Sequence, residues 1–235
     1  GVLRVAAASL AVVVTTALFG ALTVFMGNPP HATVAHWVLA AALFALLAAT
    51  VIRAGGLGGE AALSGNGSSK TVRGALAAVG VALLAIALGG LTAKVPFAAV
   101  ACPSFPLCGQ APAGTPGGAT HIQLAHRILA FLLFFHLLGI AIAVRRRTEN
   151  VAVQRAAWAA FGATLIQLLV AAAMIGMRLP PVPRALHQAM GVLVWITTFI
   201  LWYLAHRSNG ADGAATLRTA ERMPLHSRPQ PRSGA

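Results

Sequence analysis

Acidic residues are almost absent from this chain of 235 residues, which has 4 Asp and Glu against 17 Lys and Arg. Charged residues of all kinds make up only 9% of the sequence, whereas a soluble domain has about a quarter. This scarcity excludes an ordinary soluble domain with a charged surface. The net charge of +13 does not indicate a partner nucleic acid, because the basic residues lie between and after long apolar runs, where they encode membrane orientation.

Cysteine is equally scarce, since the chain has only Cys102 and Cys108, both in the proline-rich stretch ACPSFPLCGQ (101–110). No C-x-x-C-H motif is present, which excludes the usual covalent attachment of haem. Two cysteines alone cannot complete a tetrahedral metal shell. Whether the pair forms a disulfide or stays as free thiols depends on the side of a membrane on which it lies.

Apolar residues are abundant, at 58% of the chain, and they form recurrent runs near 20 residues long. Each run is long enough to cross a bilayer core of about 30 Å. We therefore predict an all-α integral membrane protein with six transmembrane helices. The predicted spans are 5–27, 34–52, 74–93, 121–144, 156–177 and 185–206.

The basic residues are distributed unequally between the two sides of such a protein. If the residues before the first span are cytoplasmic, 13 basic residues lie inside, and only Lys94, Arg127, Arg178 and Arg184 lie outside. This bias predicts a multi-pass protein of the cell inner (plasma) membrane with both termini in the cytoplasm. The loop at about 94–120 is then outside, in an oxidising compartment where Cys102 and Cys108 can form a disulfide.

Composition divides the chain into four segments. Residues 1–53 hold two spans, 54–72 form a Gly/Ser-rich cytoplasmic linker, and 73–207 hold four spans. Residues 208–235 are polar and basic and are expected to form a disordered cytoplasmic tail. Gly and Ala are abundant in the spans, which permits close helix packing and homo-oligomers.

An internal repeat relates the first two spans to the last two at an offset of 151 residues. NPPHATVAHWVLA (28–40) aligns with LPPVPRALHQAMG (179–191), so that both prolines and one histidine coincide. The paired histidines are His36 and His187, and Thr16 and Gln167 each precede their histidine by 20 residues. A repeated membrane hairpin suggests two similar helical bundles.

Two histidines, His126 and His187, lie within the first turns at the outer ends of different spans. At a similar depth in a helical bundle, two neutral imidazoles could ligate a haem iron from both faces. Arg127 and Arg184 lie next to them at the outer interface, where they could pair with haem propionates. The alternative is that a membrane histidine bonds to a neighbouring helix, which is our interpretation of His136.

One further polar residue, Gln123, precedes His126 by one helical turn and lies on nearly the same face. It could contact a cofactor, or it could simply be an interfacial polar residue.

Three stretches together resemble the haem A synthase family, cytochrome oxidase assembly proteins that convert haem O to haem A. They are GGLTAKVPFAAVACPSFPLC (89–108), HIQLAHRILAFLL (121–133), and Gln167 through PPVPRALHQAMG (180–191). The family is built from two pseudo-symmetric four-helix bundles. The resemblance implies that spans three to six form a complete C-terminal bundle, and that spans one and two are one hairpin of the N-terminal bundle.

The resemblance also assigns roles to individual residues. His126 and His187 match the axial ligands of a haem b, and His36 matches a ligand of the substrate haem. Cys102 and Cys108 match the disulfide of the outer loop. Haem O synthase and other cytochrome oxidase assembly factors are the partners that the family implies.

The sequence departs from the family in one respect, because the first N-terminal hairpin, with its histidine and its glutamate, has no counterpart here. Glu60, Glu149 and Glu221 fall on the cytoplasmic side, and the only Asp, Asp212, lies in the tail. The equivalent position in the second half is Gln123. The catalytic residue is therefore not identified, and a start at Gly1 rather than Met leads us to expect residues upstream.

Two other functions are compatible with the same residues. The first is a b-type membrane cytochrome that only transfers electrons, which the missing glutamate favours if the chain is complete. The second is a haem-free scaffold or transporter. The absence of charged residues deep within the spans disfavours an ion-coupled transporter.

Overall fold

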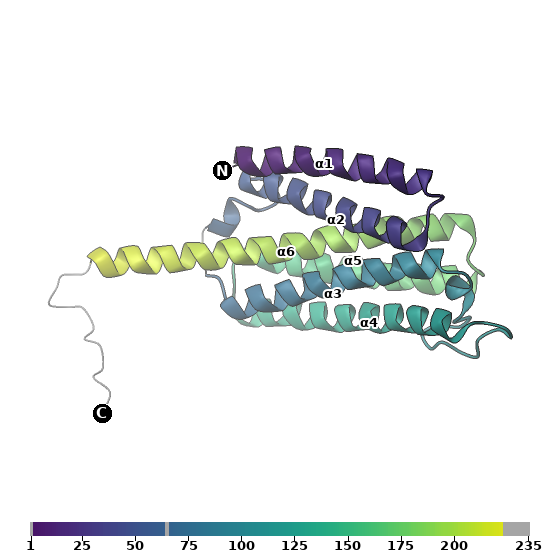
Figure 1. Cartoon of the computed structure of the whole chain (residues 1–235). Coiled ribbons are helices and arrows are strands. Elements are labelled where there is room, and N and C mark those ends of the chain that lie inside the picture. The colour runs from purple at the N-terminus through teal and green to yellow at the C-terminus, as the bar shows by residue number, and fades with distance from the viewer. Residues whose placement is uncertain (1, 64–65, 223–235) are drawn as a thin grey trace, which may run out of the picture.

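The computed structural model describes residues 2–63 and 66–222, with side chains described as far as residue 210. Within these residues the protein is all-helical, with six long helices and two short 3-10 helices, η1 and η2 (Figure 1). Each long helix is long and apolar enough to cross a membrane, which confirms the predicted all-α fold class with six spans. The bounds are α1 Val2–Phe25, α2 Pro30–Arg53, η1 Ala61–Leu63, α3 Ser69–Lys94, η2 Ala98–Val100, α4 Gly117–Arg146, α5 Val151–Gly176 and α6 Pro181–Arg222.

The helices begin where the sequence provides a capping group or a proline. The side chain of Ser68 accepts a hydrogen bond from the backbone N–H of Lys70, and that of Asn150 accepts one from Ala152. These side chains satisfy N–H groups that have no partner in the first turn of α3 and α5. Helices α2 and α6 instead begin at Pro30 and Pro181, because proline has no N–H to leave unpaired at a first helical position.

The sequence repeat at offset 151 is also present in the backbone. The turn before α2 has two consecutive left-handed residues, Gly27 (φ 78°) and Asn28 (φ 58°). The turn before α6 has another pair at the corresponding positions, Arg178 and Leu179, both at φ 62°. Left-handed conformations are uncommon for residues other than glycine, so their recurrence at equivalent positions shows that the two hairpins turn in the same way.

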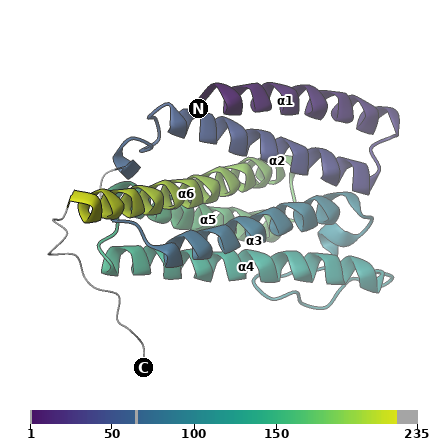
Figure 2. The ribbon, with the colours of Figure 1, turned by 60° about the vertical axis from the view of Figure 1, so that its left-hand side comes forward.

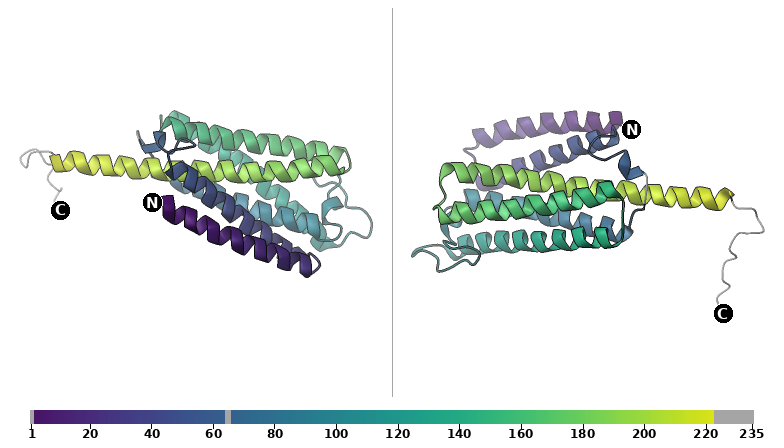
Figure 3. Two further views of the ribbon diagram at one scale, coloured as in Figure 1. Left: turned by 90° about the horizontal axis from the view of Figure 1, so that it is seen from above. Right: turned by 180° about the vertical axis from the view of Figure 1, so that it is seen from behind.

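Helices α3, α4, α5 and α6 pack in a ring, in which each helix contacts the next and α6 contacts α3. The hairpin of α1 and α2 lies beside this ring, with α2 against α3 and α6, and with α1 against α2 (Figures 1 and 2). Seen from above, α1 and α2 run at an oblique angle to α6 and diverge from it along their length (Figure 3). The long loop between α3 and α4 lies at one end of the ring, here named the loop end. The opposite end, with residues 54–68, is named the linker end.

Small residues allow the helices to approach closely. Ala75, Ala78 and Ala82 of α3 and Ala157 and Ala160 of α5 are all buried, as is typical of helix contacts in membranes. Helix α1 faces α2 with a stripe of hydroxyl side chains that donate to the backbone oxygen four residues earlier, which satisfies them within the helix. The stripe consists of Ser9, Thr16 and Thr23.

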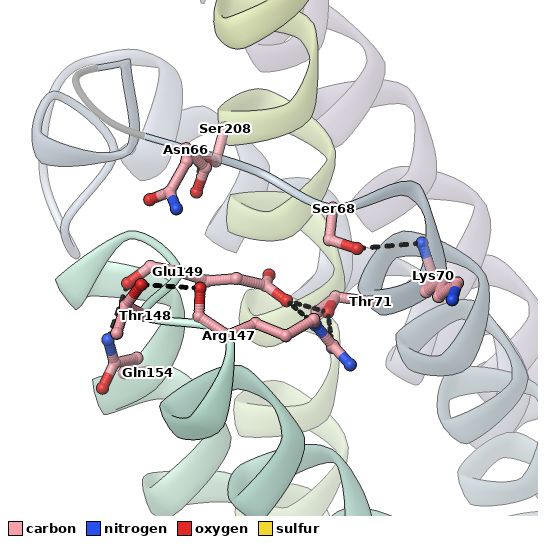
Figure 4. Close-up of polar contacts among 9 residues, drawn as sticks. All are labelled: Asn66, Ser68, Lys70, Thr71, Arg147, Thr148, Glu149, Gln154 and Ser208. Carbon is pink, nitrogen blue, oxygen red and sulfur yellow. Dashed lines mark hydrogen bonds and ion pairs between the residues drawn. The ribbon is translucent and has the colours of Figure 1, made fainter.

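At the linker end, a small polar cluster joins α3 to the turn between α4 and α5 (Figure 4). One oxygen of the buried Glu149 accepts hydrogen bonds from the Thr71 hydroxyl at 2.7 Å and from Nε of Arg147 at 2.6 Å. Arg147 also donates to the Thr71 hydroxyl oxygen. The predicted linker is attached nearby at Ala61 and Ala62, because the amide of Asn150 donates to the backbone oxygen of Ala61 at 2.8 Å and Ala62 is fully buried.

Helix α6 is longer than its predicted span, 185–206, because it continues to Arg222. Residues 208–222, which composition placed in a disordered tail, are therefore helical. The physical reason is that eight of these 15 residues are Ala, Leu, Arg or Glu, which favour helix and outweigh Gly210 and Gly213, and no proline precedes Pro224. The rest of the predicted tail, 223–235, lies outside the described residues.

Candidate functional site

A cavity of about 690 Å³ opens within the loop-end half of the helix ring. Residues of α3, α4, α5 and α6 surround it, and Trp37 and Phe44 of α2 form part of one wall. Most of its lining is apolar, with a few polar side chains. The size and lining suit an organic ligand, because ligand pockets typically measure about 300–1,000 Å³ and have few but specific polar groups.

The rings of His126 and His187 face each other within this cavity, from α4 and α6. Their centroids lie 6.5 Å apart and their planes are nearly perpendicular, at 80°. Two imidazoles that bind one iron from opposite sides have centroids about 6 Å apart, because each metal–nitrogen bond is about 2 Å long. The sequence predicted that these two histidines have similar depth, and the structure brings them together at a spacing that an iron atom would fit.

The second ring nitrogen of each histidine has a partner on a neighbouring helix. Nδ1 of His126 lies 2.9 Å from the backbone oxygen of Ala85 on α3, which leaves Nε2 free for a ligand. The side-chain amide nitrogen of Gln167 on α5, which is a donor, lies 3.1 Å from Nδ1 and 3.4 Å from Nε2 of His187. Metal-binding histidines almost always donate their second ring N–H to an oxygen, which fixes the orientation of the ring, and the contact of His126 with Ala85 is of this kind. The sequence did not predict either contact, although the repeat singled out Gln167.

The ring of His126 also lies directly against Gly89 of α3. A Cβ atom at Gly89 would be only 3.0 Å from Cε1 of His126. A larger residue would therefore push against the ring, which would have to shift by a few tenths of an ångström, so this glycine favours the close approach of α3 to the histidine.

Three arginines line the cavity, Arg127, Arg178 and Arg184. Arg127 is only 7% exposed, and its guanidinium donates to backbone oxygens of the cysteine loop, at 2.7 Å for Cys102 and 2.9 Å for Leu107. Further oxygens of the same loop, from Ser104 and Pro106, accept from Arg127 at 2.5 and 3.3 Å. The predicted pairing of Arg127 with haem propionates stays a prediction. In such a pairing, the guanidinium would have to donate to a propionate as well as to the loop oxygens. Arg184 is exposed. Arg178 also lines the cavity, although the sequence did not predict it as a site residue.

The loop between α3 and α4 covers the cavity and contains the predicted disulfide, Cys102–Cys108. Gln123 holds this loop, because its side-chain oxygen accepts a hydrogen bond from the backbone N–H of Cys102 at 2.7 Å. Gln123 is buried and also lines the cavity. Gln123 and Arg127, one turn apart on α4, therefore fix the loop on either side of His126.

His36 is not part of this constellation. It lies on α2, against Gly20 of α1, where a Cβ atom at position 20 would be 2.8 Å from Cε1 of the ring. Its Nδ1 is buried and has no hydrogen-bond partner among the residues described. His36 and His187 each lie six residues after the proline that begins their helix, so the two occupy equivalent positions in the two hairpins.

His136 and the glutamates lie outside the cavity. Nε2 of His136 is 2.8 Å from the backbone oxygen of Gly74 on α3, which confirms the prediction that it bonds to a neighbouring helix. Glu149 belongs to the linker-end cluster, and Glu60 is exposed. Among the described side chains, no carboxylate lines the cavity.

The donor set indicates the kind of metal group that would fit. Nowhere in residues 2–63 and 66–210 do three or more His, Cys, Asp or Glu side chains gather as a metal site. Two imidazoles alone are a poor site for a bare ion, which needs more protein ligands. They are sufficient for an iron whose remaining ligands come from a macrocycle, and the apolar cavity between them is large enough for an organic ring system.

These features define a polytopic helical membrane protein with a covered histidine pair at one end of the helix ring. The family model for cytochrome oxidase assembly proteins, COX15-CtaA, matches residues 1–199. The chain therefore belongs to this family, the haem A synthase family that the sequence resembles. A comparison with curated proteins finds no match for the chain.

Proposed function

We propose that the cavity binds a haem b between His126 and His187, and that the protein takes part in the oxidation of haem O to haem A. The observation that supports this most directly is the facing pair of rings, 6.5 Å apart, in a cavity of about 690 Å³. Membership of a cytochrome oxidase assembly family supports the wider biological role. By the charge distribution, the loop end is the outer side of the inner membrane.

The residues of the cavity would each contribute a distinct property. His126 and His187 supply Nε2 lone pairs, while Ala85 and Gln167 hold the rings in orientation. Arg178 and Arg184 place positive charge at the mouth of the cavity, where they can pair with carboxylates. The disulfide loop, held by Gln123 and Arg127, limits the entry of water. The bound haem would supply one-electron redox chemistry.

Conversion of a methyl group to a formyl group with water as the oxygen source releases four protons and four electrons, so the reaction needs a path by which the electrons leave to an external oxidant. We propose that the haem b site is part of this path, and that His36 is a ligand of the substrate haem on the other hairpin. Trp37, adjacent to His36 in sequence, lines the haem b cavity. This placement supports proximity of the two sites. Haem O synthase and other assembly factors are the partners proposed.

The experiment that tests haem binding is a reduced-minus-oxidised absorption spectrum of the purified protein, with pyridine haemochrome analysis. The wild type is expected to give a low-spin b-type spectrum, which His187→Ala abolishes. His121→Ala is the matched control, because His121 lies on α4 but is exposed, and it should keep the spectrum. A wild-type protein without haem under haem-replete conditions would refute the proposal and favour a haem-free scaffold.

A second candidate is a b-type cytochrome that only transfers electrons. The placement of the described carboxylates favours it, because Glu60 and Glu149 lie at the linker end, away from the cavity and from His36, so neither proposed haem site has one of these carboxylates beside it as a general acid or base. The two functions differ in one measurement, since only a haem A synthase produces haem A when membranes that contain the protein are supplied with haem O.

A further inference from the structure

A second pocket, open and about 400 Å³ in volume, lies at the linker end of the helices. It lies between the C-terminal end of α2 and the second half of α6, beside the start of α1. Its lining consists of Val2, Arg53, Tyr203, His206, Arg207 and Gly210. His187 and His206 are separated by about 28 Å of helix, at about 1.5 Å per residue. The pocket is therefore separate from the histidine cavity, and its function can be tested independently of haem.

Two arginines give this pocket a positive charge that no described carboxylate neutralises. Among the side chains described, the ion pair is Arg147–Glu149, which does not belong to the pocket. The Nε atom of Arg53 donates to the hydroxyl of Tyr203, and its guanidinium carbon lies 5.9 Å from the centre of the Tyr203 ring. Tyr203 thus holds the guanidinium of Arg53 at the pocket.

The Nε atom of Arg207 is buried and has no hydrogen-bond partner among the described residues. Buried donors without partners are rare in folded proteins, and each one requires an explanation. A guanidinium N–H binds phosphate oxygens strongly and with defined geometry. Because Nε is closed to solvent, an anionic ligand in the open pocket would bind the terminal amino groups of Arg207.

The surface directly below these cations, toward the middle of the membrane, is apolar and aromatic. The ring centroids of Phe199, Trp202 and Tyr203 lie 5.5 to 6.0 Å apart, and these residues pack with α2 and with Val5 of α1. Trp and Tyr are typical of the boundary between membrane and water. Large apolar side chains continue along α1 and α2 and are exposed, namely Leu3, Leu10, Leu47 and Val51.

We propose that this pocket binds the phosphate of an anionic phospholipid, with Arg53 and Arg207 on the phosphate oxygens. The acyl chains would lie along the apolar surface of α1, α2 and α6. Basic pockets between membrane helices on the cytoplasmic side are suited to anionic head groups. Free phosphate would use the same arginines, but the adjoining apolar surface favours the lipid. The bound lipid would join the α1–α2 hairpin to α6 at the linker end.

The test measures lipid binding by the full chain in detergent, with native mass spectrometry during titration with phosphatidylglycerol or phosphatidylcholine. Phosphatidylglycerol should bind in preference to phosphatidylcholine. The double variant Arg53→Gln/Arg207→Gln should weaken phosphatidylglycerol binding about tenfold or more, because charge-assisted hydrogen bonds are lost. The control, Arg145→Gln/Arg146→Gln, removes the same charge at the same end from exposed residues outside the pocket, and should change binding less than about twofold.

Equal weakening by the two double variants would overturn the proposal, because it would indicate attraction to net charge alone. Complete displacement of the lipid by millimolar inorganic phosphate would overturn the assignment to a phospholipid. Circular dichroism checks that each variant is folded. If the double variant does not fold, Arg207→Lys is decisive, because it keeps the charge but loses the planar guanidinium that pairs with phosphate oxygens. It should weaken binding severalfold, and unchanged binding would refute the role of Arg207.

Discussion

The amide group of Gln167 lies across the imidazole of His187, with its Nε2 3.1 Å from Nδ1 and 3.0 Å from the backbone oxygen of the same histidine. A neutral imidazole that binds iron through Nε2 carries its proton on Nδ1, and this proton needs an acceptor. Oε1 of Gln167 is buried and has no partner among the described residues. Rotation of the terminal amide would bring this oxygen to Nδ1 and would break the hydrogen bond from Nε2 to the His187 backbone oxygen, so Gln167 would be a positioning residue for the proposed ligand at the cost of that bond.

Two substitutions of Gln167, to Glu and to Leu, should therefore change the midpoint potential of the bound haem in opposite directions. Gln167→Glu provides a carboxylate acceptor, which makes the imidazole more basic, stabilises ferric iron and lowers the potential. Gln167→Leu removes the acceptor, so the potential should rise and haem affinity should fall by about 10- to 100-fold. A spectroelectrochemical titration measures both effects. Shifts of the same sign in the two variants would contradict this role for Gln167.

The contact between Gly89 and His126 predicts that haem binding is weakened by any side chain at position 89. Gly89→Ala would put a Cβ atom 3.0 Å from Cε1 of His126, so the ring must move and haem content should fall severalfold. Gly80→Ala is the matched control on α3, because nothing lies within 4 Å of the added Cβ. It should leave haem content unchanged and favour the helix by up to about 1 kcal/mol. The haem-to-protein ratio measures the difference, and equal ratios would argue against a tight contact.

Arg127 is expected to control access to the Cys102–Cys108 disulfide. Arg127→Met removes the hydrogen bonds to four loop oxygens, and hydrogen bonds to a charged group contribute about 1.5–3 kcal/mol each. The disulfide should then be reduced by dithiothreitol at least about tenfold faster, as measured by alkylation and mass spectrometry. Arg184→Met, which changes an exposed arginine, should leave the rate near that of the wild type. A similar acceleration in both variants would show that the loop does not depend on Arg127.

The buried carboxylate of Glu149 is expected to stabilise the linker end. Glu149→Gln removes the ion pair with Arg147 but keeps an acceptor for Thr71 (Figure 4). We expect a loss of about 1–3 kcal/mol and a thermal midpoint lower by about 2–4 °C per kcal/mol. Thermal unfolding in detergent measures this change. Glu60→Gln, at an exposed position, should unfold at the wild-type temperature, and equal midpoints for the two variants would exclude this stabilising role.

Hydropathy was sufficient to predict the six helices, because a bilayer core requires about 20 apolar residues in each span. The pairing of Cys102 with Cys108 also followed from simple reasoning about spacing and orientation, and the disulfide is present. The proximity of His126 and His187 was predictable because both lie at the same end of their helices. Their roles as haem ligands stay a prediction.

The contacts that orient these residues could not be predicted from the sequence. Nδ1 of His126 lies against a backbone oxygen, that of Ala85, and every residue has such an oxygen, so the side chain at position 85 gives no signal. Gln123 and Arg127 hold a loop whose path has no periodicity. The length of α6 was underestimated because polar composition was given more weight than the helix propensity of 208–222.

His36 rests against Gly20 and His126 rests against Gly89, so both imidazoles lie on glycines of the preceding helix. A ring pressed against backbone has few rotamers left, and the conformational entropy of the side chain is lost when the helices pack rather than when a ligand arrives. Preorganised groups bind more tightly, because no further ordering opposes the association. The protein without its ligand should therefore hold these rings close to the orientation that the iron requires.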